Sequence, residues 1–153
     1  MKWNDLRDES CPVARGLSVI GDRWTMLVLR DCFLGVRRFD DIQKRLGVTR
    51  HVLADRLRKL EEDGVLERRQ YQERPPRFEY RLTDKGKALH PVLMTLIHWS
   101  DTWVPAAKGD GPVMLNRDTG APVQPLLIDA TTQQPLTHRS VRRVERDATM
   151  PRK

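Results

Sequence analysis

The sequence predicts a mainly α-helical fold with a small β-hairpin wing, a winged helix-turn-helix, followed by a C-terminal appendage of short strands. Three observations support this fold: a helix with marked ends at residues 49–64, a shorter amphipathic segment at 39–46, and two short aromatic and aliphatic runs at 65–71 and 78–82. In such folds the second helix lies in a DNA major groove and the hairpin lies beside it. We place the winged helix-turn-helix in residues 1–104 and the appendage in residues 105–153.

Residues 49–64 are expected to form the recognition helix. Thr49 can cap its N-terminus, and Gly64 can end it in the left-handed conformation. Spacing of i, i+4 and i+7 puts one buried stripe on Leu53, Leu57 and Leu60. The outward and N-terminal side chains should meet base edges or nearby phosphates: Thr49, Arg50, His51, Asp55 and Arg58. Two further cations, Arg56 and Lys59, should contact phosphates.

The segment before this helix completes the predicted helix-turn-helix. Apolar residues recur at Phe39, Ile42 and Leu46, and Gly47-Val48 forms a tight turn. We expect Arg37-Arg38 to open that helix and to contact the DNA backbone, as would Lys44. Net charge is +7, and residues 37–59 hold eight basic against three acidic residues, which favours a polyanionic partner. A basic helix face alone is equally typical of solvated surface. The hairpin that follows is therefore needed to favour DNA binding.

The two short runs predict strands joined by residues 72–77. Pro75-Pro76 stiffens the tip, and Arg74 and Arg77 flank the prolines. A hairpin with a basic tip after a recognition helix is a wing, and we expect the two arginines to enter the flanking minor groove.

Several motifs together resemble one bacterial family. They are Cys11-Pro12-Val13-Ala14-Arg15, Gly21-Asp22-Arg23-Trp24-Thr25, Leu53-Ala54-Asp55-Arg56-Leu57, the Pro75-Pro76 hairpin and Leu82-Thr83-Asp84-Lys85-Gly86. In this order and spacing they resemble the HxlR-type winged helix-turn-helix transcription regulators, over about Cys11 to Val104. The resemblance implies a homodimer that binds operator DNA and responds to a signal, often a reactive electrophile or oxidant.

Cys11 is the candidate sensor. Pro12 suits the first position of a helix, so Cys11 would be its N-cap, with Gly21 at the far end. A thiol there faces unpaired N–H groups and the positive end of the dipole, which favour the reactive thiolate. The alternative is a small buried residue without chemistry. Cys32 lies in the next helix, 23–34, and is expected to be a packed core thiol; Trp24 is expected in the core, with a ligand pocket as the alternative.

Thr83 should cap a C-terminal helix that continues, kinked at Pro91, to Trp103. Its wide apolar face comprises Leu89, Val92, Leu93, Leu96, Trp99 and Trp103. We expect this face to pack against a second copy, with dimerisation helices at about 11–34 and 83–104 and two recognition helices one DNA turn apart. The alternative is packing on the N-terminal helix of the same chain. His90 and His98 are expected at the surface or the interface.

Composition changes at residues 104–112, where the appendage is expected to begin. In longer members of the family, the region that resembles this appendage carries metal-binding His and Cys residues. The matching positions in this chain are Asn116, Thr119, Asp129 and Thr132. These four are a poor zinc set, so we expect no metal and no cofactor. The basic end at 139–146 is expected to be a solvated tail, with nonspecific phosphate contacts as the alternative.

We therefore expect a cytoplasmic, homodimeric regulator of double-stranded DNA, a repressor rather than an activator, with a small-molecule or oxidant effector. Residues 1–10 are polar and no run has membrane-spanning length, so neither a signal peptide nor a membrane partner is expected. Paired carboxylates, a phosphate loop and a credible Cys-His pair are lacking, which disfavours an enzyme. The alternative is a winged-helix module that binds proteins without specific DNA binding.

Overall fold

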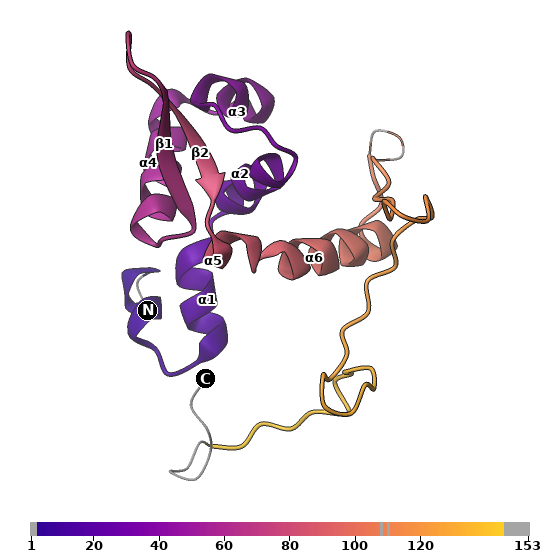
Figure 1. Cartoon of the computed structure of the whole chain (residues 1–153). Helices are drawn as coiled ribbons and strands as arrows, with labels where there is room; N and C mark the ends of the chain where they lie inside the picture. The colour runs from indigo at the N-terminus through magenta and orange to yellow at the C-terminus, as the bar shows by residue number, and fades with distance from the viewer. Residues whose placement is uncertain (1–2, 108, 110, 146–153) are drawn as a thin grey trace. The chain divides into compact units, whose positions relative to one another are not determined.

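The computed structural model describes residues 3–107, 109 and 111–145. The described elements, in chain order, are η1 (Trp3–Asp8), α1 (Pro12–Ile20), α2 (Arg23–Phe33), α3 (Phe39–Leu46), α4 (Arg50–Glu62), β1 (Leu66–Gln72), β2 (Arg77–Leu82), α5 (Asp84–Lys87) and α6 (His90–Trp103) (Figure 1). The chain divides into two compact units, one up to Leu96 and one from Ile97 onward, so that the division falls within α6. Within the described ranges, no helix is long and apolar enough to cross a membrane.

The predicted helix-turn-helix is confirmed. Thr49 caps α4, because its side chain accepts a hydrogen bond from the Val52 backbone N–H at 3.3 Å. Gly47 ends α3 with φ of 64°, a left-handed conformation that glycine adopts without steric penalty, and this permits the short turn between α3 and α4. The three predicted leucines of α4 are each 1% exposed.

The core of the first unit lies between α2, α3, α4 and the base of the hairpin. Val28 and Leu29 of α2 are fully buried, as are Ile42 of α3 and Val65 before β1. Trp24 was expected in the core; it is only partly buried and packs against this cluster. The buried leucines orient α4 so that its opposite, polar face points away from the core.

Asp31 of α2 is a buried carboxylate that sequence analysis does not single out. Its side chain is 0% exposed and pairs with Arg30 at 2.9 Å and with Arg45 of α3 at 3.2 Å. The backbone carbonyl of Asp31 also accepts from the Val36 N–H at 3.0 Å. Asp31 therefore ties the central helix to the first helix of the helix-turn-helix.

β1 and β2 form the predicted antiparallel wing, with Leu66 opposite Leu82 at the base and Gln72 opposite Arg77 at the tip. The expected start of α3 is wrong by two residues, because the helix begins at Phe39 rather than at Arg37. Arg38 instead forms a β-bridge with Glu79, and the Tyr80 N–H donates to the Arg37 carbonyl at 2.8 Å. Backbone pairing with β2 therefore keeps both arginines extended.

The predicted C-terminal helix is present in two pieces. The Thr83 side chain caps α5 by accepting from the Gly86 N–H at 3.1 Å. The break falls at Ala88-Leu89, before the expected kink at Pro91. The ring of His90, at the start of α6, packs edge-on against Phe33 with centroids 5.0 Å apart.

Beyond α6, the predicted short strands occur as isolated β-bridges, Leu115 with Pro122 and Ile128 with Pro135. Each hairpin turn is closed by a side chain at a position that the resemblance aligns with a metal ligand. Asn116 accepts from the N–H of Thr119 at 3.0 Å, and Asp129 accepts from the N–H of Thr131 at 2.7 Å. Arg146 of the predicted basic tail lies outside the described residues.

Candidate nucleic-acid interface

The outward face of α4 carries most of the predicted DNA contacts. Thr49, Arg50 and His51 are exposed at its N-terminus. Arg50 pairs with Asp40 of α3 at 2.8 Å, and its guanidinium lies over the Phe39 ring at 4.6 Å. Arg50 is thus already oriented by α3 before any partner binds, whereas the first turn of α4 stays accessible.

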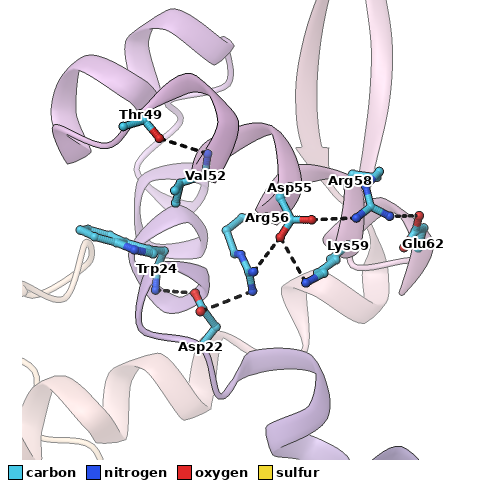
Figure 2. Close-up of polar contacts among 9 residues, drawn as sticks. All are labelled: Asp22, Trp24, Thr49, Val52, Asp55, Arg56, Arg58, Lys59 and Glu62. Carbon is cyan, nitrogen blue, oxygen red and sulfur yellow. Dashed lines mark hydrogen bonds and ion pairs between the residues drawn. The ribbon is translucent and has the colours of Figure 1, made fainter. Parts of the chain in front are cut away.

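Asp55 lies at the centre of an ion-pair network on the same helix (Figure 2). One carboxylate oxygen accepts from Arg58 at 2.7 Å, and the other contacts Arg56 at 2.7 Å and Lys59 at 3.1 Å. Burial by itself would raise the pKa of Asp55, but hydrogen bonds from Arg58 and Lys59 outweigh it and leave that pKa lowered. Asp55 therefore stays ionised at neutral pH.

The network extends in two directions from Asp55 (Figure 2). Arg58 also donates to Glu62 at 2.6 Å, and the two carboxylates raise the pKa of Arg58. In the other direction Arg56 is 3.4 Å from Asp22, whose second oxygen caps α2 by accepting from the Trp24 N–H at 2.8 Å. Arg56 is only 20% exposed, so it joins α4 to α2 rather than projecting toward a ligand.

The wing presents its own cations. Arg74 and Arg77 are exposed at the tip, on either side of the two prolines. Next to the tip, two arginines stack on aromatic rings: Arg68 of β1 on Phe78 at 3.7 Å, and Arg38, from the segment before α3, on Tyr71 at 4.8 Å. These two arginines are therefore engaged within the chain, whereas Arg74 and Arg77 are exposed.

The three predicted backbone contacts before and within α3 are brought together. Arg37, Arg38 and Lys44 are exposed and line an open cavity of about 760 Å³. Arg45 adds a fourth cation, against the carboxylates of Asp41 and Glu79. This surplus of positive charge beside the helix-turn-helix suits a phosphate backbone.

The two cysteines have different surroundings. Cys11 is the N-cap of α1, as predicted, and its side chain is exposed. Burial, reinforced by the nearby Asp31 carboxylate, raises the pKa of Cys32 to about 12. Cys32 is therefore a protonated core thiol at neutral pH. Within the described part of the chain, no group of three or more His, Cys, Asp or Glu side chains is arranged to hold a metal ion.

The predicted dimer residues fall into two groups. Leu93 is buried and Leu89 packs against the core of its own chain. The other four are exposed: Val92 at 43%, Leu96 at 44%, Trp99 at 55% and Trp103 at 72%. On α1, Val13 and Leu17 are also exposed, at 67% and 43%.

Sequence reasoning missed the acidic partners of the basic face. Glu62 lies four residues after Arg58 and Asp55 three before it, a spacing at which helical side chains pair, so this signal was present in the sequence. The contacts of Arg56 with Asp22 and of Arg45 with Asp31 join different helices, and no local pattern predicts them.

Comparison with known proteins supports the assignment of these elements. A family model described as HxlR-like helix-turn-helix matches residues 19–108. An HTH-type transcriptional regulator of Mycobacterium tuberculosis is 40% identical over 136 residues, which are 88% of this chain and 85% of that one. The crystal structure of PA1607, a candidate transcription factor, has a TM-score of 0.82 at 43% identity, covering 92% of this chain and 98% of that chain. The redox regulator HypR in its reduced form has a TM-score of 0.56 at 31% identity, covering 60% and 92%.

Proposed function

The chain belongs to the HxlR-like helix-turn-helix family of DNA-binding transcriptional regulators, and we propose that it is a repressor that binds operator DNA as a homodimer. One observation carries the proposal: the exposed N-terminal turn of α4 lies in the same unit as a wing with two exposed arginines at its tip. A helix for the major groove and a basic tip for the adjacent minor groove are the two contacts that a winged helix makes.

Each contact has a separate task in the proposed complex. Thr49, Arg50 and His51 would meet base edges, since the N-terminal residues of a recognition helix enter the groove. The cations around the cavity before α3 would position the domain on phosphates. The tip arginines would enter the minor groove, where negative potential favours arginine.

The dimer is supported by the exposed apolar residues of α6. Val92, Leu96, Trp99 and Trp103 are four large apolar side chains on one helix, and a second copy would cover them. A two-fold axis through such a helix pair would set two recognition helices about 34–36 Å apart, one turn of DNA. Leu96→Asp should yield monomers in sedimentation analysis, with His98→Asp on another face of α6 as the control.

The proposed signal is oxidation or electrophilic modification of Cys11, which is exposed at the N-terminus of α1. A relative by structure, HypR, is itself a redox regulator. Modification would regulate only by favouring one dimer geometry over another, since a signal without differential affinity shifts nothing. Cys11→Ser should abolish any response to oxidants, while Cys32→Ala should keep it; a response that survives in Cys11→Ser would exclude this sensor.

The deciding experiment measures fluorescence anisotropy of the protein on labelled DNA from upstream of its own gene and on scrambled DNA, over a salt series. We expect a preference of about 10³-fold or more for the first DNA. Arg74→Ala with Arg77→Ala should weaken binding and reduce the salt slope by about one per lost phosphate contact. Arg117→Ala, an exposed arginine beyond α6, is the matched control.

Equal and steeply salt-sensitive binding to both DNAs would contradict specific regulation. In that case the alternative, a winged-helix module that binds proteins, becomes the better explanation of the same fold.

A further inference from the structure

The ion-pair network centred on Asp55 carries no net charge in the free protein. Arg56, Arg58 and Lys59 carry three positive charges, and Asp22, Asp55 and Glu62 carry three negative ones within the same network. Every one of these six side chains has a partner at 3.4 Å or less. The positive charge of this face is therefore not freely available to DNA phosphates.

We infer that Asp55, with Glu62 as its second member, is a specificity-determining acidic clamp: it withholds Arg58 and Lys59 from phosphates and presents Arg58 in one orientation. The inference rests on the proposed DNA-binding function and deepens it. Asp55 was expected to meet base edges, whereas its carboxylate already has three cationic partners.

The geometry of Arg58 shows how the clamp would act. One terminal nitrogen donates to Asp55 and the other to Glu62, at 2.7 and 2.6 Å, so the plane of the guanidinium is fixed from both sides. Arginine has five N–H donors, and those left over can still point at a base edge. A fixed guanidinium can thus meet a guanine without leaving the clamp, but it must leave the clamp to follow a phosphate.

Asp55 itself is held in place from behind. Arg56 joins it to Asp22, and Asp22 is the N-cap of α2. Because α2 is the central core helix, Asp55 cannot swing away with Arg58 when a phosphate approaches. A DNA phosphate at a random sequence must therefore compete with the fixed, negatively charged Asp55 carboxylate for the Arg58 side chain. At such a sequence no contact to a base compensates for that competition.

The test compares Asp55→Asn, Glu62→Gln and the parent protein on operator and scrambled DNA over a salt series. Asp55→Asn should tighten binding to scrambled DNA by about 10-fold and steepen its salt slope by about one to two, because Arg58 and Lys59 are released to phosphates. The affinity for the operator should change less, so the ratio of operator affinity to scrambled-DNA affinity should fall. Glu62→Gln should give the same change in smaller measure.

Asp84→Asn is the matched control, because it removes one negative charge from α5, where Asp84 is 99% exposed and pairs only with Lys87 among the described residues. If Asp55→Asn and Asp84→Asn changed the affinity for scrambled DNA and its salt slope equally, the change in net charge alone would explain the result, and the inference would be overturned. Loss of operator binding with unchanged binding to scrambled DNA would also overturn it, since Asp55 would then contact a base. A parent protein without preference would instead contradict the proposed function.

Discussion

Replacement of Asp31 by Asn tests whether the buried carboxylate stabilises the joint between α2 and α3. The side chain is 0% exposed and accepts from Arg30 at 2.9 Å and from Arg45 at 3.2 Å. Asn keeps the volume but loses the charge, and its amide group would place N–H donors against guanidinium donors. Breaking a buried ion pair costs about 3–5 kcal/mol.

The lower end of that range applies here. Arg30 and Arg45 are 39% and 48% exposed, so water can solvate both once the carboxylate charge is gone. We therefore expect a loss of about 3 kcal/mol in the free energy of unfolding. Asp31 lies in the compact unit Met1–Leu96. The melting temperature of a domain of about 60–100 residues shifts by roughly 4–8 °C per kcal/mol, so it should fall by about 12–24 °C.

Urea denaturation followed by circular dichroism measures the loss directly. Asp101→Asn makes the same chemical change at an exposed position of α6 and should stay within about 0.5 kcal/mol. A double-mutant cycle with Arg45→Gln isolates the contribution of the pair between helices. A loss below about 1 kcal/mol for Asp31→Asn would refute the argument that burial makes this carboxylate important.

Three further outcomes follow from burial and packing. Native protein should react with a thiol reagent at Cys11, whereas Cys32 should react only after unfolding; mass spectrometry of the labelled peptides tells them apart. Burial raises the pKa of Cys32 from 9.0 to about 12, so the stability that its protonated form contributes should be complete below pH 9.0 and decline as pH rises toward 12, a decline that Cys32→Ala should lack. Gly86→Ala would push its Cβ into the carbonyl oxygen of Val65 and should cost about 1–3 kcal/mol, while Gly16→Ala in α1, with open space around it, should stabilise by about 0.5–1 kcal/mol in the same thermal melts.

The elements that sequence analysis predicts well are those with local signals. For α4 these signals are the capping Thr49 just before the helix, the leucine stripe within it and Gly64, with φ of 65°, just after it, and each is a near neighbour of the residues it acts on. The hairpin likewise has its strand residues and its turn in one continuous stretch. Such signals need no knowledge of the rest of the fold.

The features that sequence analysis missed depend on distant partners. Arg37 and Arg38 follow the helix pattern of the residues after them, yet β2 captures their backbone from about 40 residues away. Asp55 was correctly placed on the outer face, but an outward position does not reveal whether a carboxylate faces a base or three neighbouring cations. Asp31 lies in a strongly apolar helix, and only the fold brings Arg45 to it.

The pairing of Arg37 and Arg38 with β2 has a consequence for how any inducer can act. The bridge from Arg38 to Glu79 and the bond from Tyr80 to Arg37 attach the base of the hairpin to the segment that leads into α3. Because of these two contacts, we expect the hairpin and the helix-turn-helix to move together as one body. In the proposed dimer, the remaining freedom is the rotation and separation of two such bodies. An inducer of the proposed dimer would then change the distance between the two bodies, so that they match a different half-site spacing along the duplex, while the contacts within each body stay unchanged.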